Sequence, residues 1–358
     1  MIKTLKKLVS FKTTHESGHE QEFGKLFDFV VKQIKGCGVT HKFITSGGHR
    51  SLIISKGKKL TKRPKVRLMM HIDVVPASAK MFTAREQGGK LLGRGVIDDK
   101  FATAACIELI RELRHESRDF GAIITAEEEI GGQHGAQHIL KLGYRGQIFV
   151  VPDGGENLSL EYEAKGVLHL EVKAPGQAAH GSQPWLGQNA LDLLLGGYER
   201  LRKIFPETKR ESWEPTLNLG KIEGGRAVNQ VPDMAVMLLD FRYPISYRNG
   251  RARIMRAVRQ CFGGCTVRIE SAGGPFLTDS QHPALRRWIE IVRQVTKRTP
   301  KLERSYGATD ARYLTPYKIP AIITYPQGGG LHTEQEWLDL KSFRQFYEIL
   351  RAFVRQVT

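Results

Sequence analysis

The 358-residue sequence has few cysteines and no long hydrophobic run. Its four cysteines are too few to cross-link a chain of this length, and three lie in apolar or glycine-flanked stretches where a free thiol is usual. No run approaches the ~18 apolar residues of a transmembrane helix, and the N-terminus lacks the apolar core of a signal peptide. These absences exclude a disulfide scaffold and an integral membrane protein, and we expect a cytoplasmic protein.

Acidic residues are also in the minority, because 37 Asp and Glu stand against 55 Lys and Arg, a formal net charge of +18. Such an excess is typical of nucleic-acid-binding proteins. In residues 248–262, however, Ile254, Val258 and Phe262 recur at helical spacing and arginines fill other positions, as in a helix with one solvated face. No recognised binding motif accompanies the charge, so we favour a solvated surface over a nucleic-acid partner.

Short apolar runs alternate with helical patterns in the first and last parts of the chain. Such alternation predicts an α/β fold, with a mostly parallel sheet covered by helices on both faces. The predicted strands are 66–73, 121–125, 147–153 and 321–326, and the predicted helices are 101–116, 135–142, 282–298 and 341–356.

The middle of the chain has a different order. Between about 165 and 275 the pattern is strand, helix, strand, strand, helix, strand, the βαββαβ order of a ferredoxin-like α+β unit. Because this unit interrupts the α/β pattern, it is interpreted as an inserted domain. We predict a catalytic domain of residues 1–164 and 276–358, and an inserted domain of residues 165–275.

Potential metal ligands follow four of the predicted strands. They are His71 and Asp73, the run Glu127–Glu129, Asp153, and His332. Since the carboxyl ends of parallel strands meet at one edge of a sheet, these side chains should converge. Together with Asp98 they would crowd several carboxylates at one edge, where only a cation keeps them ionised. Two divalent ions about 3.5–4 Å apart, bridged by one carboxylate, would do so.

An ordered set of motifs carries a family resemblance from about residue 66 to 340. The motifs are H-x-D, G-R-G-x-x-D-x-K, E-E-x-G, A-x-H-G-S-x-P-W-x-G-x-N-A, G-A-T-D-A-R and H-x-x-x-E-W. The set resembles the co-catalytic zinc hydrolases of metallopeptidase family twenty, which includes glutamate carboxypeptidase, tripeptidase T, aminoacylase and succinyl-diaminopimelate desuccinylase. The resemblance implies a zinc-peptidase catalytic domain with an inserted lid, and two divalent ions per chain, zinc or alternatively cobalt or manganese.

The resemblance also implies five metal ligands. His71 and Asp153 would be terminal ligands of one ion, Glu129 and His332 of the other, and Asp98 would bridge both. Asp73 would accept the free ring N–H of His71 and fix its tautomer. The peptide bond after Asp98 would be cis.

Glu128 is implied as the general base. The spacing of E-E-x-G selects Glu128 and Glu129 and leaves Glu127 structural. Successive strand residues point to opposite faces, so both selected residues reach one site only if the strand has already ended. Glu156 is the alternative to Asp153 as a ligand. Histidines outside the motifs, His15 and His134 among them, are interpreted as structural.

Within the inserted domain, His180 matches the histidine that polarises the scissile carbonyl, often from the partner subunit. Asn229 and Arg242 match substrate-binding positions, and the planar guanidinium of Arg242 suits a carboxylate. A surface salt bridge is the alternative for Arg242. Gly329, within the glycine run 328–330, would offer backbone N–H groups to the same carboxylate. The resemblance further implies a homodimer formed through the lid.

The function implied is that of a di-zinc amidohydrolase, in which a metal-bridging hydroxide formed with Glu128 attacks an amide carbonyl. Cleavage of small peptides is favoured because an aspartate at position 153 resembles the amino- and dipeptidases of the family. An N-acyl-amino-acid deacylase is the alternative, since G-G-P-F-L-T-D-S and G-A-T-D-A-R-Y resemble the desuccinylase branch. A nucleic-acid-binding protein on an inactive hydrolase fold is the alternative from another class, and only the charge supports it.

Overall fold

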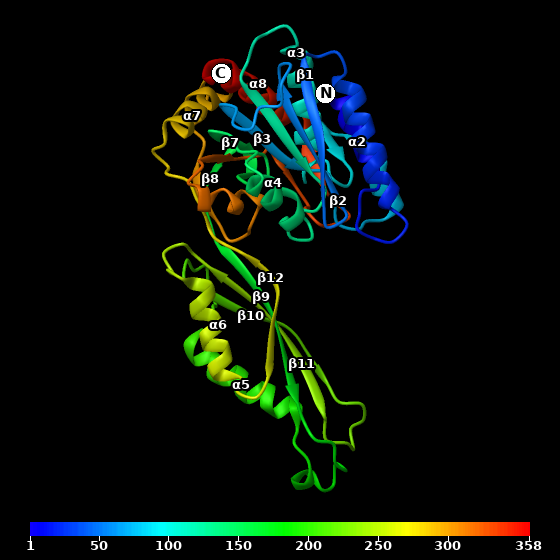
Figure 1. The fold of residues 1–358 in the computed structure, drawn as a ribbon, viewed down its shortest axis with the longest axis vertical. Helices are drawn as coiled ribbons and strands as arrows, with labels where there is room; N and C mark the ends of the chain where they lie inside the picture. Colours follow the sequence, from blue (N-terminus) through cyan, green and yellow to red (C-terminus); the bar gives the residue numbers. More distant parts are fainter. The chain divides into compact units, whose positions relative to one another are not determined.

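The computed structural model describes residues 1–358 as two compact units, whose course along the chain can be followed in Figure 1. Unit 1 contains Met1–Glu163, Leu277–Ser305 and Thr309–Thr358, and unit 2 contains Ala164–Phe276 and Tyr306–Ala308. The division falls beside the boundaries expected at 165 and 275. The short return at 306–308 was not predicted.

A nine-stranded sheet lies at the centre of unit 1. Its strands are β1 (Val39–Ser46), β2 (His49–Lys56), β3 (Val66–His71), β6 (Phe120–Thr125), β7 (Ile148–Val151), β8 (Leu160–Ala164), β13 (Phe276–Leu277), β14 (Leu302–Ser305) and β15 (Ala321–Ile323). The order is β1-β2-β6-β3-β7-β15-β8-β13, with β14 paired to β8. The central strands β6, β3, β7 and β15 run parallel, whereas β2 and β8 add antiparallel strands on either side.

The central strands are apolar because both faces of the sheet are covered. Every residue of β3 and of β6 is buried, as expected for a parallel sheet between two layers. The last register pair of these two strands is His71 with Thr125. The residues that follow β6 therefore emerge at the same sheet edge as His71.

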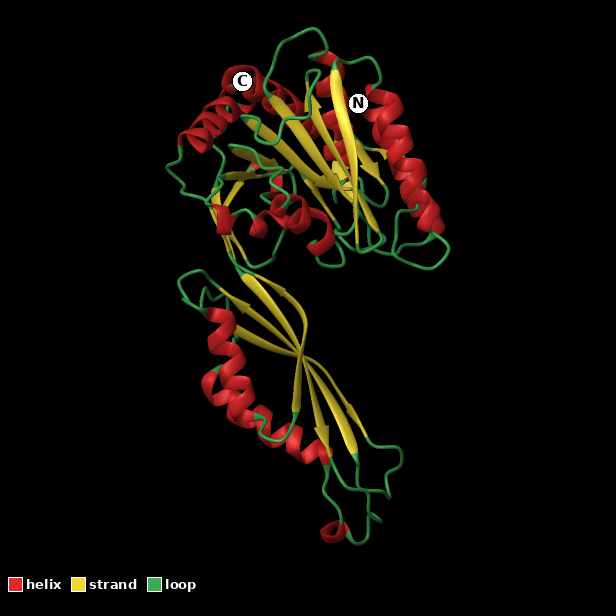
Figure 2. Cartoon of the chain, viewed as in Figure 1, coloured by secondary structure: helices red, strands yellow, loops and turns green.

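Helices of unit 1 pack on the sheet as predicted for an α/β fold (Figure 2). They are α1 (Ile2–Val9), α2 (Glu20–Ile34), α3 (Lys100–Glu112), α4 (His138–Lys141), α7 (Pro283–Thr296) and α8 (Leu340–Val357). Residues of α1, α2, α3, α7 and α8 share one hydrophobic core with Leu68 and Met70 of β3. Within it, the Trp288 ring of α7 contacts Phe346 and Phe353 of α8.

The helix predicted at 135–142 has a different form. A π-helical turn, Gln133–Gln137, precedes the short α4. The backbone N–H groups of His134 and Gly135 donate to the Glu127 carboxylate at 2.7 and 2.9 Å. N–H groups at the start of a helix have no acceptor within the helix. The Glu127 carboxylate supplies that acceptor and so stabilises the start of this turn.

A small second sheet in unit 1 joins two distant segments. Its strands are β4 (Arg85–Gln87), β5 (Lys90–Leu92), β16 (Gly328–Gly329) and β17 (Trp337–Asp339), in the order β16-β17-β5-β4. Trp337 pairs with Leu92 and Asp339 with Lys90. The pairing places the chain before Asp98 beside the chain that carries His332.

Unit 2 has the predicted βαββαβ order. Its elements are β9 (Gly166–Pro175), α5 (Ala190–Ile204), β10 (Thr216–Gly224), β11 (Met234–Tyr243), α6 (Gly250–Cys261) and β12 (Thr266–Gly273). The strands form an antiparallel sheet in the order β10-β11-β9-β12. Both helices share one hydrophobic core with the sheet and cover the same face of it (Figure 2). This is the ferredoxin-like arrangement.

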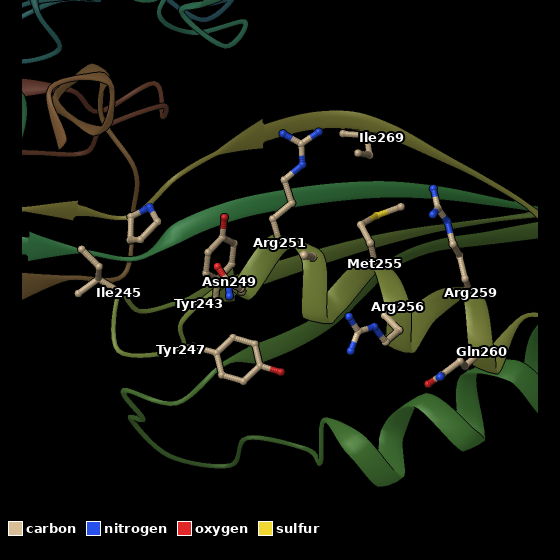
Figure 3. A pocket seen from close by; sticks show the side chains of 13 residues that line it. Tyr243, Ile245, Tyr247, Asn249, Arg251, Met255, Arg256, Arg259, Gln260 and Ile269 are labelled. Atoms are coloured by element: carbon tan, nitrogen blue, oxygen red, sulfur yellow. The ribbon is translucent and has the colours of Figure 1, made fainter. Parts of the chain in front are cut away.

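A hollow of about 940 Å³ lies beside α6 in unit 2 (Figure 3). Tyr243, Met255 and Ile269 line it, and the exposed Arg251 and Arg259 stand around it. None of the predicted site residues lines this hollow. The predicted pattern of α6 is confirmed, because Ile254 and Val258 are buried and the arginines of the helix are exposed.

All four cysteines are free. No helix has an apolar stretch long enough to cross a bilayer.

Candidate metal centre

The five predicted metal ligands of unit 1 form two groups that share one residue. His71, Asp98 and Asp153 form the first group, and Asp98, Glu129 and His332 form the second. Within each group the potential ligand atoms lie within 4.8 Å of one another. Asp98, the predicted bridging ligand, belongs to both.

Three strand ends and two loops bring these residues together. His71 is the last residue of β3, Glu129 follows the end of β6, and Asp153 follows the end of β7. Asp98 lies in the loop before α3, and His332 in the loop between β16 and β17. The site therefore lies beyond the carboxyl ends of the parallel strands, where open α/β sheets bind ligands.

Asp98 presents one carboxylate oxygen to each histidine. Its Oδ1 lies 3.1 Å from Nε2 of His71, and its Oδ2 lies 3.1 Å from Nε2 of His332. Nε2 of His332 is also 3.4 Å from Oε2 of Glu129. A carboxylate that faces two separate imidazoles in this way can bridge two ions. The peptide bond between Asp98 and Asp99 is cis, as the resemblance implies.

The residues fit divalent metal ions. Oε1 of Glu129 is buried without a hydrogen-bond partner, and the buried Nε2 of His71 has only its ion-pair contact with Asp98. Buried polar atoms are normally hydrogen-bonded, so the unpaired Glu129 oxygen beside these groups indicates a ligand. Imidazole nitrogen with carboxylate oxygen is a donor set that zinc accepts.

The pKa values in the metal-free site show how strongly its charges interact. Burial alone would lower the pKa of His71, but Asp73 and Asp98 raise it well above the usual value. Hydrogen bonds with Asp98 and Glu129 raise the pKa of His332 to about 10. Burial opposes ionisation of Asp98, yet its bonds with His332 and His71 keep its pKa below the usual value. Without metal, protonated His71 and His332 therefore offset the carboxylate of Asp98 together with those of Asp73 and Glu129.

The remaining carboxylates are harder to ionise. Burial raises the pKa of Asp153 to about 7. Burial, followed by the charges of Asp153 and Asp310, raises the pKa of Glu128 well above the usual value. A bound cation would lower these pKa values and hold the carboxylates ionised.

Glu128 lies in the turn after β6, beside Arg312. Since β6 ends at Thr125, the side chains of Glu128 and Glu129 do not have to point to opposite faces of a strand, and both can face one site. Oε1 of Glu128 is 3.8 Å from Nη1 of Arg312, whose Nη2 donates to the carbonyl of Gly131 at 2.8 Å. Arg312 belongs to the G-A-T-D-A-R motif, so this motif supports the turn that carries the predicted base.

Two alternatives receive little support from these positions. Glu127 belongs to neither ligand group, and its carboxylate holds the π-helical turn. Glu156 is exposed and also belongs to neither group. Asp153, and not the alternative Glu156, belongs to the first ligand group.

The predicted contact of Asp73 differs in detail. Nδ1 of His71 is 3.1 Å from the backbone carbonyl of Asp73, and 3.4 Å from its Oδ1. The other carboxylate oxygen, Oδ2, accepts the N–H of Glu129 at 2.9 Å and lies 3.2 Å from Nε2 of His15. Asp73 thus supports ligands of both groups, and it does so with its backbone as well as its side chain.

Two residues of the site were not predicted from the sequence. His15 contacts Asp73, but it lies far from every motif and no local pattern marks it. Glu336 is buried next to the Asp98 loop. The sequence did mark this residue, because Glu336 is the glutamate of the motif H-x-x-x-E-W.

The three predicted residues of unit 2 do not all lie together. Gly181, beside His180, donates its N–H to the carbonyl of Asn229 at 2.7 Å, and both His180 and Asn229 are exposed. Arg242 lies at the other end of β11, roughly 26 Å from its first residue, Met234, in a strand that rises ~3.3 Å per residue. Its guanidinium donates to Asp240 at 2.8 and 3.3 Å. This contact is the salt bridge considered as the alternative for Arg242.

Gly329, the predicted substrate-binding glycine of unit 1, lies in β16, three residues before His332. It pairs with Trp337 of β17. Its backbone therefore belongs to the small sheet that frames the metal ligands.

Comparison with known proteins agrees with this fold. The sequence profile described as peptidase family M20/M25/M40 matches residues 68–356. A probable carboxypeptidase of Aspergillus terreus is 32% identical over 274 residues, which are 69% of this chain and 62% of that protein. The chain thus spans less than two thirds of that relative.

A second relative matches over its whole length. A succinyl-diaminopimelate desuccinylase of a Sulfurovum species is 22% identical, with 100% of this chain and 99% of that protein covered. Among solved structures, the M20 family metallo-carboxypeptidase Sso-CP2 of Sulfolobus solfataricus has a TM-score of 0.82 at 16% identity, and covers 99% of this chain and 98% of its own. This likeness shows a shared fold.

Proposed function

Because the chain belongs to peptidase family M20/M25/M40, we propose that it is a metal-dependent amidohydrolase that cleaves the peptide bond of small peptides. The observation that carries this proposal is the pair of three-residue ligand groups that share Asp98. His71 and Asp153 would complete one metal site, and Glu129 and His332 the other. Zinc is the expected ion, with cobalt or manganese as substitutes.

In this proposal the chain's own residues position the water and move its proton. When bound, two divalent ions polarise an amide carbonyl and lower the pKa of a water molecule toward ~7. Glu128 accepts a proton from the attacking water and later gives it to the leaving amine. Burial raises the pKa of Glu128 in the metal-free chain, and the bound ions would lower it again, so that an ionised carboxylate is ready to accept the proton. Arg312 holds the turn on which Glu128 lies.

Unit 2 would act as the lid and as the dimer contact. His180 would polarise the substrate carbonyl and Asn229 would bind the substrate, which agrees with their exposed positions on adjoining segments. Arg242 would bind a substrate carboxylate by exchanging its bond with Asp240 for one to the ligand. Gly329 would contribute backbone N–H groups to the same carboxylate.

A substrate panel tests the proposal. The chain is stripped of metal with a chelator and reloaded with zinc, cobalt or manganese, and di- and tripeptides are assayed beside N-acetyl and N-succinyl amino acids. We expect hydrolysis only after reloading, with the highest kcat/KM on a peptide. A fully loaded chain that hydrolyses no amide in the panel would contradict the proposal.

The second candidate is an N-acyl-amino-acid deacylase. The full-length match to a succinyl-diaminopimelate desuccinylase favours it. A higher kcat/KM on N-succinyl or N-acetyl amino acids than on any peptide would establish it in place of the peptidase.

An inactive fold that binds nucleic acid is disfavoured, because two complete ligand groups and the neighbouring Glu128 are present. Nucleic-acid binding that falls steeply with salt concentration, in a chain without hydrolase activity, would support it instead.

A further inference from the structure

The carboxylate of Glu336 is fully buried and uses both of its oxygens. Oε2 accepts from Nη1 of Arg94 at 2.6 Å and from the N–H of Gly95 at 3.0 Å. Oε1 accepts from the N–H groups of Ile97 and Asp98 at 3.1 and 3.3 Å. An ionised carboxylate offers about four acceptor positions, so this side chain is fully occupied.

These four bonds join two segments that each carry a predicted metal ligand. Asp98 is itself one of the donors, and Glu336 follows His332 by four residues. The backbone strengthens the same link, because Gly93 donates its N–H to the carbonyl of Glu336 at 3.2 Å. One side chain therefore sets the position of the Asp98 backbone relative to the His332 loop.

His332 needs such an anchor. Its side chain is 57% exposed, and its backbone has the left-handed φ of 60°. A non-glycine residue rarely adopts this conformation, and it persists where the surrounding structure determines it. The N–H of Thr333 donates to the carbonyl of Gly330 at 3.0 Å and closes a turn that contains His332, and the Glu336 carboxylate holds the loop four residues further on.

We propose that Glu336 is a positioning residue of the metal centre, which holds Asp98 and His332 at the separation that the second ligand group needs to bind an ion. This inference rests on the metal centre of the proposed function. Glu336 would contact neither metal nor substrate, and it would act through the two ligands whose segments it joins.

Metal titration of the stripped chain tests this role directly. Zinc binding is followed by calorimetry, and cobalt binding by its visible absorption bands, which report ligand geometry. In Glu336→Gln the amide nitrogen is a donor and meets backbone N–H donors. We expect the second ion, held by Asp98, Glu129 and His332, to bind about 10–100-fold more weakly, the usual effect of losing such a supporting bond. The first ion should lose less affinity, because of its three ligands only Asp98 lies on a segment that Glu336 holds. The second cobalt spectrum should change as well.

The matched control is Glu334→Gln. Glu334 lies two residues away on the same loop, is exposed, and accepts from the N–H of Ser78 at 2.8 Å. It makes no bond with the Asp98 segment, so its removal should leave both binding curves unchanged.

A double variant separates positioning from stability. Glu336→Gln alone leaves the buried Arg94 guanidinium without a negatively charged partner, which lowers Tm. Arg94→Met with Glu336→Gln removes both charges, so Tm should recover while the second ion still binds weakly. If the single variant does not fold, metal titration of the double variant tests the proposal in its place.

Recovery of metal affinity together with Tm would overturn the proposal, as would wild-type binding of both ions by Glu336→Gln. A wild-type chain that binds two ions but hydrolyses nothing would contradict the proposed function alone, because the role of Glu336 is tested by metal affinity and not by hydrolysis. A wild-type chain that binds no ion would overturn both.

Discussion

Nε2 of His15 lies 3.2 Å from Oδ2 of Asp73, whose other oxygen lies 3.4 Å from Nδ1 of His71. A histidine near the N-terminus is thus connected through one buried carboxylate to a predicted metal ligand. The same carboxylate accepts the N–H of Glu129 at 2.9 Å. Asp73 therefore requires a well-defined position, and His15 helps to fix it.

Replacing His15 by phenylalanine should weaken metal binding. The ring contacts with Phe23 and His49 would be kept, but the bond with Asp73 would be lost. We expect roughly tenfold weaker binding, the lower end of the range for such supporting bonds, measured by zinc calorimetry. His41→Phe, the same substitution at an exposed position of β1, is the control. Equal affinity in His15→Phe and the control would mean that Asp73 is held without His15.

Glu128→Gln should abolish turnover and leave both ions bound. The amide cannot take a proton, and general-base catalysis contributes about 10²–10⁴-fold to the rate. The readouts are kcat and the metal content of the purified chain. Glu127→Gln is the control, because it keeps an oxygen for the N–H groups of His134 and Gly135. If the control lost the rate and Glu128→Gln kept it, the base would be Glu127.

Asp153→Asn should reduce the bound metal from two ions to one. Asp153 belongs to the first ligand group only, so the second group keeps all of its residues. Metal content per chain measures this directly. Glu156→Gln, an exposed neighbour outside both groups, should keep both ions. The reverse pattern would assign the ligand to Glu156.

Metal binding should release protons and strengthen as the pH rises. In the metal-free chain the pKa of His332 is raised to about 10, and that of His71 lies well above its usual value. Both rings are therefore protonated at neutral pH and must lose a proton before they bind a metal. Calorimetry in two buffers of different ionisation enthalpy counts the protons released. Affinity that is constant between pH 6 and 8, with no proton release, would show that the histidines are neutral before binding.

Mixing two inactive variants tests the proposed homodimer. If His180 completes the site of the partner subunit, a heterodimer of Glu128→Gln with His180→Ala contains one site with both residues intact. We expect partial activity after the subunits have exchanged, and none from either variant alone. No recovery despite measured exchange would mean that His180 acts within its own chain or takes no part.

The central strands and long helices were predictable because their patterns are strong. Fully buried strands such as β3 and β6 give continuous apolar runs, and amphipathic helices such as α7 and α8 repeat their apolar residues at helical spacing. The hairpin β1–β2 was not predicted, since β1 is an edge strand with half-exposed residues and no continuous apolar run. The strands of the small sheet have two or three residues each, too few to show any period.

The residues grouped at the metal centre were predictable because a general rule places them. Strand ends of a parallel sheet meet, so the convergence of His71 and Asp153 followed from this rule, whereas their assignment as ligands came from the family resemblance. The contact of His15 with Asp73 depends on tertiary folding alone. For Arg242 the sequence did contain a signal, because residues 240 and 242 of a strand point to the same side, and their salt bridge follows from that spacing.

Strand β15 lies between β7 and β8 in the sheet of unit 1, although all of unit 2 is encoded between β8 and β15. If the sheet begins to form during synthesis, the edge of β7 that pairs with β15 has no partner until the inserted unit has been made. An open edge of this kind promotes pairing with other chains, and proteins of this size are most prone to aggregate while partly folded. The order of the strands along the chain thus leaves the nascent protein open to aggregation until residues 321–323 have left the ribosome and paired with β7.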